Sequence, residues 1–331
     1  MPESFALPHR PRRNRRTAAI RGLVRETSLD ASRLIYPLFI KEGDGDEPIS
    51  AMPGYSRLSL DGLIREATAA HELGVNAVVL FPAIAPELKT PDAEECANPD
   101  GLVPRAITRL KRELPDVIVI TDVALDPYNS DGHDGIVAPD GEILNDETVA
   151  VLCAQALAHA EAGADIVSPS DMMDGRVGAI RAALDHEDFT EVSILAYTAK
   201  YASACYGPFR GALDSAPKFG DKKTYQMDPA NAREALREAQ FDEAEGADML
   251  MVKPAGMYLD VIASLRGHTT LPLAAYQVSG EYLMIKAAAA TGWLDEKKLA
   301  LESLLAIRRA GADMILTYFA KDAAAWLKQA E

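Results

Sequence analysis

Two lysines carry the most reactive chemistry that the sequence offers. Lys253 directly follows an apolar run, residues 248–252, and Pro254 comes next. The run predicts a buried strand that ends at the proline, which has no N–H for a sheet ladder. Burial disfavours the charged form of an amine, and a neutral lysine is a nucleophile toward ketones and aldehydes. The alternative is a lysine that extends from the strand end into solvent.

Lys200 follows the preceding predicted strand, residues 192–197, and is therefore a candidate to stand beside Lys253. In a barrel of parallel strands, the carboxyl ends of the strands meet at one mouth, where active sites form. Two like charges in one apolar mouth disfavour double protonation, so at least one amine moves toward its neutral form. The pair predicts an enzyme that forms lysine Schiff bases with carbonyl compounds.

The elements that must position these lysines repeat along the chain. Four helical segments end at a glycine and lead into an apolar strand, at Gly74, Gly163, Gly246 and Gly311. Glycine is the usual residue just after a helix, because it accepts the left-handed conformation there. Near-continuous apolar strands predict a parallel sheet that is covered on both faces.

The whole pattern is an alternation of strands and helices. The predicted strands cover residues 34–40, 77–81, 117–123, 165–169, 192–197, 248–252, 273–278 and 314–319. The predicted helices cover residues 60–73, 101–113, 145–162, 176–184, 229–245, 257–266, 281–290 and 296–309. This predicts an α/β fold with a closed (β/α)8 TIM barrel. A doubly wound open sheet is the alternative, although the loop at residues 41–46 is too acidic to bind phosphate.

Three segments lie outside this alternation. Residues 82–101 and 201–228 are longer than ordinary barrel loops, and the second predicts an active-site lid whose Arg210, Lys222 and Lys223 suit an anionic substrate. Residues 1–30 are predicted to form an arm before a catalytic barrel of residues 31–331. The first 25 residues hold seven arginines and one acid, whereas the chain as a whole has a formal net charge of −16. The arm therefore suits an acidic neighbouring subunit, with nucleic acid as the alternative partner.

The composition predicts a cytoplasmic protein with no membrane partner. No apolar run approaches the roughly 20 residues that a membrane helix needs. The N-terminus lacks the apolar stretch of a signal peptide. Cys96, Cys153 and Cys205 are scattered and lack the spacing of zinc ligands or disulfides, which fits a reducing compartment.

Five motifs together resemble the porphobilinogen synthase family, also called 5-aminolevulinate dehydratase. They lie at residues 168–176, 197–201, 206–210, 251–254 and 276–282, and the likeness runs from about residue 5 to the C-terminus. The resemblance implies a hydro-lyase with a TIM barrel and no organic cofactor. It implies that the enzyme condenses two molecules of 5-aminolevulinate to porphobilinogen, with loss of two waters, in tetrapyrrole biosynthesis.

The resemblance also implies roles for individual residues. Lys253 matches the lysine that forms a Schiff base with the substrate that becomes the propionate half, and Lys200 matches the lysine that holds the second substrate. The first carboxylate is bound at the positions of Ser279 and Tyr318. The second carboxylate is bound at the positions of Arg210, Lys222 and Gln226. Asp122 and Ser170 match pocket-lining groups that handle protons or bind the substrate amine. The family often has arginine at position 222, and lysine keeps the charge without the bidentate fork.

Metal use differs among members of this family. Ala124, Asp126 and Asp134 stand where zinc-dependent relatives carry cysteine ligands, so thiolate-bound zinc is excluded at this position. Asp126 and Asp134 either hold a hard ion such as Mg²⁺ or stay metal-free and bind the substrate amine. Glu238 matches the glutamate that binds allosteric Mg²⁺ in magnesium-activated members, the alternative being an exposed helix glutamate. The resemblance further implies a homo-octamer in which the arm wraps a neighbour.

Two other functions remain as alternatives. A class I aldolase also uses a barrel lysine, but it needs a phosphate site after the last strands, where Glu281 places an acid. A nucleic-acid-binding protein would act through residues 10–25, although the acidic remainder repels phosphates. The sequence therefore favours a Schiff-base enzyme without a nucleic-acid partner.

Overall fold

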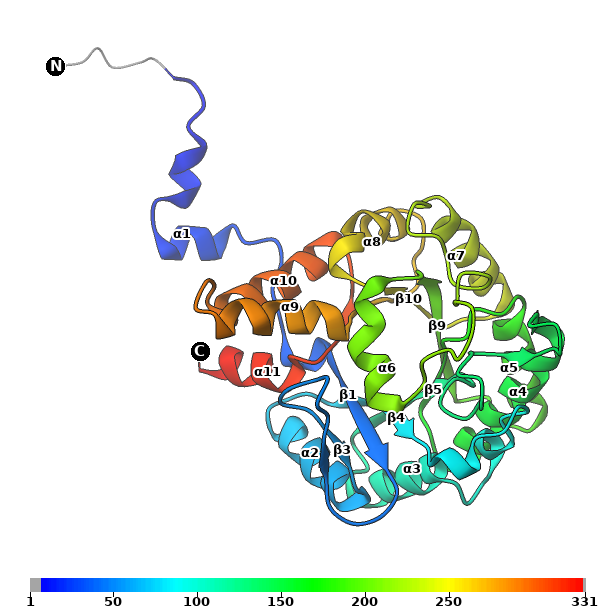
Figure 1. Ribbon diagram of the computed structural model, residues 1–331. Coiled ribbons are helices and arrows are strands. Elements are labelled where there is room, and N and C mark those ends of the chain that lie inside the picture. Colours follow the sequence, from blue (N-terminus) through cyan, green and yellow to red (C-terminus); the bar gives the residue numbers. More distant parts are fainter. Residues whose placement is uncertain (1–6, 330–331) are drawn as a thin grey trace.

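The computed structural model describes residues 7–329, and within this range eight parallel strands close into a barrel (Figure 1). The strands are β1 (Leu34–Lys41), β4 (Ala77–Ala83), β5 (Ile118–Val123), β8 (Ile166–Pro169), β9 (Ser193–Lys200), β10 (Met249–Lys253), β11 (Leu273–Gln277) and β12 (Met314–Thr317). Pairing of β12 with β1 closes the ring, as in the register of Leu34 with Ile315. The predicted TIM barrel is confirmed, and the open sheet is wrong because a closed ring leaves no edge among these strands.

A ring of helices covers the outer face of the barrel. They are α2 (Leu60–Glu72), α3 (Leu102–Glu113), α4 (Asn145–Glu161), α5 (Arg176–His186), α7 (Glu234–Glu245), α8 (Leu259–Arg266), α9 (Ser279–Ala290), α10 (Glu296–Ala310) and α11 (Ala320–Lys328). In α3 the buried side chains include Leu102, Ala106 and Leu110, one helical turn apart, so one stripe faces the strands. Gly246 ends α7 with a φ of 100°, a conformation that explains the glycine expected there.

The mouth of the barrel carries structure that the alternating pattern did not predict. Helix α6 (Gly207–Leu213) lies across the mouth within the segment predicted as a structureless lid (Figure 1). Two short strands, β2 (Glu47–Pro48) and β3 (Ser56–Leu58), extend the sheet beside β1, and β6 (Ile136–Val137) pairs with β7 (Ile143–Leu144). Short 3₁₀ turns complete the loops: η2 (Ala31–Arg33), η3 (Pro86–Leu88), η4 (Glu94–Ala97), η5 (Ala204–Tyr206) and η6 (Gly256–Tyr258).

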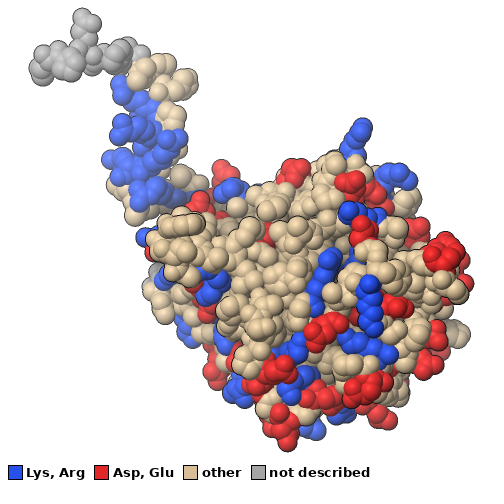
Figure 2. All heavy atoms as spheres, in the orientation of Figure 1, with Lys and Arg blue, Asp and Glu red and all other residues tan. Residues whose placement is uncertain are grey.

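The N-terminal segment projects away from the barrel (Figure 1). It contains η1 (Pro11–Arg15) and α1 (Ala18–Leu23), neither of which buries a residue. Its exposed arginines give this segment a basic surface (Figure 2). Across residues 7–329, no helix combines the length and the apolar character that a membrane crossing requires.

Candidate active site

Lys253 ends β10 inside a cage of aromatic rings. Its side chain is only 5% exposed, and Nζ lies 4.8 Å from the ring centre of Tyr276. The ring centres of Tyr197, Tyr206 and Phe209 lie 5.1–5.2 Å from the same nitrogen. Burial in this apolar cage lowers the pKa of Lys253 to about 7, and the nearby Lys200 ammonium acts in the same direction. A substantial fraction of this amine is therefore neutral and nucleophilic near neutral pH.

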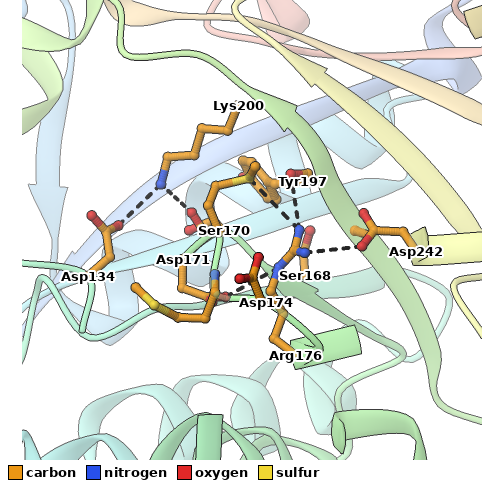
Figure 3. Close-up of polar contacts among 12 residues, drawn as sticks. Asp134, Ser168, Ser170, Asp171, Asp174, Arg176, Tyr197, Lys200 and Asp242 are labelled. Atoms are coloured by element: carbon orange, nitrogen blue, oxygen red, sulfur yellow. Dashed lines mark hydrogen bonds and ion pairs between the residues drawn. The ribbon is translucent and has the colours of Figure 1, made fainter. Parts of the chain in front are cut away.

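Lys200 stands directly beside Lys253, because the two residues are register partners in the pairing of β9 with β10. Lys200 Nζ donates to Asp134 Oδ1 at 3.2 Å and to the backbone carbonyl of Ser170 (Figure 3). Its side chain is as buried as that of Lys253, yet it has a carboxylate and a carbonyl as acceptors. The two neighbouring amines therefore occupy different environments.

A second lysine also binds Asp134. Lys222, from the segment that covers the mouth, places Nζ 2.7 Å from Asp134 Oδ2 and 3.4 Å from Asp126 Oδ2. Tyr225 donates its hydroxyl to Asp134 Oδ2 at 3.0 Å. Burial alone would raise the pKa of Asp134, but the ammonium groups of Lys200 and Lys222 hold it below its usual range. The Asp134 carboxylate thus connects Lys200 of the barrel to Lys222 and Tyr225 of the covering segment.

Asp122 supplies a carboxyl group of a different kind. Burial raises the pKa of Asp122 to about 7, against the opposing attraction of Lys253. Among the described residues, no hydrogen-bond partner reaches its Oδ1 atom, although this atom is fully buried. A carboxyl group that titrates near neutral pH beside an amine is suited to general acid–base chemistry.

These groups line one cavity, together with Tyr206 and Phe209 from the covering segment. The predicted site residues on its wall are Asp122, Asp126, Asp134, Ser170, Lys200, Arg210, Lys222, Gln226 and Lys253. Only about 20 Å³ of free space remains within it, room for about one water. A ligand larger than water therefore needs the covering segment to move.

The sequence matches a protein family over nearly its whole length. The description of that family is Delta-aminolevulinic acid dehydratase, and the match covers residues 8–326. The chain belongs to this family. The expected family and its reaction are thereby confirmed, namely condensation of two 5-aminolevulinate molecules to porphobilinogen by a hydro-lyase of tetrapyrrole biosynthesis.

Individual dehydratases are similar over almost all of the chain. The chloroplastic delta-aminolevulinic acid dehydratase of Physcomitrium patens is 66% identical over 324 residues, which is 98% of this chain and 75% of the relative. The chloroplastic enzyme of Selaginella martensii is 65% identical over 97% of this chain and 77% of its own length. The crystal structure of the Toxoplasma gondii dehydratase with its reaction product porphobilinogen has a TM-score of 0.98 at 56% identity, covering 99% of this chain and 94% of that one.

The relatives correct one expectation, the cytoplasmic location. The similar dehydratases from Physcomitrium patens, Selaginella martensii, Glycine max and Oryza sativa are all named as chloroplastic proteins, at 62–66% identity. The prediction depended on missing membrane and signal-peptide features and on scattered cysteines. None of those features distinguishes the cytoplasm from a plastid interior, so the prediction was wrong.

Two residues expected to bind the first carboxylate lie outside the lysine cavity of this dehydratase. The Ser279 hydroxyl accepts the backbone N–H of Phe209 at 3.1 Å, and the Tyr318 hydroxyl is 2.9 Å from that of Tyr276. Tyr318 instead lines a separate hollow beside β1 and β3. Phe209 of α6 occupies the Ser279 hydroxyl with its backbone N–H and faces Lys253 with its ring, while Tyr276 occupies the Tyr318 hydroxyl.

The aromatic cage is the part of the site that the sequence analysis did not assign. The family motifs include Tyr206, Phe209 and Tyr276, but the sequence alone did not indicate a chemical role for these rings. The available signal was position, because Phe209 precedes Arg210 and Tyr276 is the last residue but one of β11, next to the predicted site. An apolar cage around a lysine depends on rings from separate elements, which spacing along the chain does not reveal.

Glu238 lies apart from this site, on α7. It lines a second cavity of about 500 Å³ whose other acidic residues are Glu142, Asp174 and Glu234. Burial raises the pKa of Glu238, and nearby Asp242, Asp174 and Glu234 add to the effect, against Arg176. Within residues 7–329, no group of three or more His, Cys, Asp or Glu side chains is arranged to enclose a metal ion.

Proposed function

We propose that this dehydratase binds its two 5-aminolevulinate molecules as Schiff bases, the first on Lys253 and the second on Lys200. The observation that carries the proposal is the pair of buried amines in register on β9 and β10, at one cavity. The family supplies the substrate, a keto acid with a free amine. Each attachment requires an amine to add to the ketone carbon and the resulting carbinolamine to lose water.

Lys253 is the better nucleophile of the pair. Its neutral amine attacks the ketone of the first substrate, and the carbinolamine takes up one proton as it loses water, which gives a protonated Schiff base. The faces of the four surrounding rings attract the cation that forms at this nitrogen, which offsets part of the cost of its burial. Asp122 is positioned on the same cavity wall to accept and return protons, because its pKa lies near 7.

The groups around Lys200 suit the second substrate. Arg210 and Lys222 supply positive charge for its carboxylate, and Gln226 supplies an amide. Asp126 and Asp134, which face ammonium groups in the structure, would exchange them for the ammonium group of the substrate. Ser279 and Tyr318 would bind the first carboxylate once Phe209 moves away from the Ser279 hydroxyl.

Residues 201–228 would act as a lid on a catalytic domain of residues 31–331, with residues 1–30 as a separate arm. The small free volume of the cavity supports a lid, because neither substrate can enter while Phe209 and Lys222 occupy the mouth. Lys222 pairs with two carboxylates of the barrel and would have to leave them when the lid opens. Lid opening therefore requires these two ion pairs of Lys222 to break.

Trapping of the two Schiff bases tests this assignment. The protein is mixed with 5-aminolevulinate and sodium borohydride, which reduces an imine to a stable amine, and the modified lysines are mapped by mass spectrometry. We expect adducts on Lys253 and Lys200. Adducts on another lysine alone would refute the proposal.

Activity that disappears with a zinc-selective chelator and returns only with zinc would refute the expected zinc-independence.

Glu238 is the proposed contact for allosteric Mg²⁺. Its cavity fits a hydrated ion rather than an enclosed one, because the carboxylates are not arranged as a ligand cage. Bound Mg²⁺ would supply positive charge that balances the clustered acids, whose proximity raises the pKa of Glu238. Glu238→Ala should abolish stimulation by Mg²⁺ and preserve activity in its absence. An unchanged Mg²⁺ response in this variant would exclude the site.

Self-association through the arm, as a homo-octamer, is the proposed assembly. The described part of the arm buries no residue in η1 or α1 and carries a basic surface, while the chain as a whole is acidic. A partner subunit would cover this surface and pair with its arginines. Sedimentation of the full chain and of a chain lacking residues 1–25 tests the proposal, which predicts a smaller assembly for the shortened chain.

A further inference from the structure

Arg176 is a buried arginine that joins three elements behind the lysine cavity. It is the first residue of α5, and its side chain is 3% exposed. Its Nη1 donates to Asp242 Oδ1 on α7 at 3.1 Å, and its Nη2 donates to the backbone carbonyl of Tyr197 on β9 at 3.3 Å. Its Nε lies 3.9 Å from Asp171 Oδ1, just after β8 (Figure 3).

A guanidinium group this deeply buried is favourable only when good partners compensate for its lost hydration. Arginine is suited to this position, because its rigid fork of donors can reach several acceptors in different directions at once. Asp171 is itself fixed, since its Oδ2 accepts the backbone N–H of Met173 at 2.8 Å. Arg176 therefore hydrogen-bonds to β9 and α7, and it contacts the turn after β8 through the ion pair with Asp171 and through Met172 Sδ, 3.9 Å from Nη2.

The same turn carries the acceptor of Lys200. Ser170, immediately before Asp171, offers its backbone carbonyl to Lys200 Nζ. Tyr197, whose carbonyl binds Arg176, lies three positions before Lys200 on β9. One guanidinium group thus contacts both the strand that carries Lys200 and the turn that receives its ammonium group.

Lys253 has a much weaker link to this network. Its Nζ faces the ring of Tyr197 at 5.1 Å, and the described residues include no hydrogen-bond acceptor for it. Arg176 contacts the backbone carbonyl of Tyr197 and not its ring. Disturbance of Arg176 should therefore affect the two lysines unequally.

We propose that Arg176 is a positioning residue for Lys200, which it orients through the Ser170–Asp171 turn and the Tyr197 carbonyl. The inference depends on the proposed function, in which Lys200 holds the second substrate. Arg176 does not line the lysine cavity, so it acts through other residues. Its loss would displace one of two amines that must meet their substrates in a fixed geometry.

Arg176→Lys is the variant that tests this role. Lysine keeps the positive charge between Asp171 and Asp242, so neither carboxylate is left with an unpaired negative charge. Its point-like ammonium group cannot serve all three contacts of the guanidinium fork. Asp242→Asn is a second test, because it keeps the side-chain volume and removes only the charged anchor on α7.

Arg266→Lys is a matched control. Arg266 also joins a carboxylate to backbone carbonyls, at Asp313, Thr269 and Leu271, but these lie at the opposite end of the barrel, before β11 and β12. This substitution should lower the melting temperature without affecting either lysine. The readout is the ratio of borohydride-trapped 5-aminolevulinate on Lys200 to that on Lys253, together with the rate of porphobilinogen formation.

We expect Arg176→Lys and Asp242→Asn to lower the Lys200-to-Lys253 ratio and the rate by about tenfold, and Arg266→Lys to leave the ratio unchanged. A wild-type ratio in both folded variants would overturn the positioning role. An equal fall in Arg266→Lys would also overturn it, because the cause would be general loss of stability. A wild-type protein without any Lys200 adduct would instead refute the proposed function of Lys200, and the inference with it.

Discussion

The ends of β9 and β10 present the same side chain in two different environments. Lys253 faces four aromatic rings, and its Nζ has no hydrogen-bond acceptor among the described residues. Lys200, its register partner, donates to Asp134 and to the Ser170 carbonyl. Both side chains are about equally buried. Burial alone therefore does not define a reactive lysine, and the nature of the surrounding groups decides which form the amine takes.

The difference suits a site that must treat two identical substrates differently. The caged amine of Lys253 is prepared to attack the first ketone. The Nζ of Lys200 is instead bound by Asp134 and by the Ser170 carbonyl, and it must leave these partners before it can meet the second ketone. The comparison therefore predicts that Lys253 acts before Lys200. Each of the following variants changes the surroundings or the identity of one of the two lysines.

Lys253→Met should have the largest effect, because it removes the proposed first point of attachment. We expect the rate of porphobilinogen formation to fall by about 10⁴-fold or more, as for the loss of other covalent nucleophiles. The measurement is a colour assay for the pyrrole. Lys200→Met serves as the comparison and should retain a borohydride adduct on Lys253. A Lys253→Met variant within tenfold of wild-type activity would show that the order is wrong.

Asp134→Asn should have the next largest effect. It removes the carboxylate that binds both Lys200 and Lys222, so we expect kcat to fall by about 10²-fold. Asp126→Asn is the matched control, because among the described residues the Asp126 carboxylate pairs with Lys222, at 3.4 Å, and not with Lys200. Steady-state kinetics should give a smaller loss for that variant, near tenfold. Equal losses would mean that the pairing of Lys200 with Asp134 has no separate importance.

The strands that carry this comparison were predictable from sequence. The run at residues 34–40 became β1 (Leu34–Lys41), and the run at 248–252 became β10 (Met249–Lys253), because a barrel strand buried on both faces is continuously apolar. The missed helix α6 begins at Gly207 with Pro208 next. These residues fall within the predicted lid of residues 201–228, although proline also fits the first turn of a helix.

The environments of the two lysines were not predictable from sequence in the same way. The lysines stand at strand ends, where position along the strand indicates which residues reach the mouth. The partners of Lys200 are a backbone carbonyl, which every residue has, and a carboxylate 66 positions away. Arg176 was noted only within a family motif, since its three partners come from separate elements. Contacts of this kind depend on how the elements pack, which local patterns do not specify.

The pH dependence of kcat/KM tests whether the aromatic cage keeps Lys253 in its neutral form. Since the pKa of Lys253 is lowered to about 7, the neutral amine is lost as the pH falls below that value. We expect kcat/KM to fall about tenfold per pH unit there. Phe209→Leu admits water to the cage, so the pKa of Lys253 rises and the fall begins at higher pH. Asp122→Asn removes an anion that favours the charged form of Lys253, so the fall should persist and move to lower pH. Its disappearance in that variant would assign the titration to Asp122 instead.

The smallest expected effect is on stability, and its sign follows from the same lowered pKa. Lys253 has a pKa of about 7 in the folded protein and an ordinary value of 10.5 when unfolded, so between these values the unfolded chain binds more protons. The contribution of Lys253 to the stability of the wild-type protein should therefore rise with pH across this window. Lys253→Met should raise the melting temperature by several degrees at or below pH 7, and the gain should vanish toward pH 10.5.

Calorimetry across this pH range measures the gain, with Asp122→Asn as the background for both proteins. That background removes Asp122, a buried carboxyl group whose own pKa, also about 7, would respond to loss of the Lys253 charge. A gain that stays constant with pH would mean that the methionine merely packs better than the lysine. It would also mean that Lys253 carries its charge in the folded protein, in which case the aromatic cage does not distinguish it from Lys200.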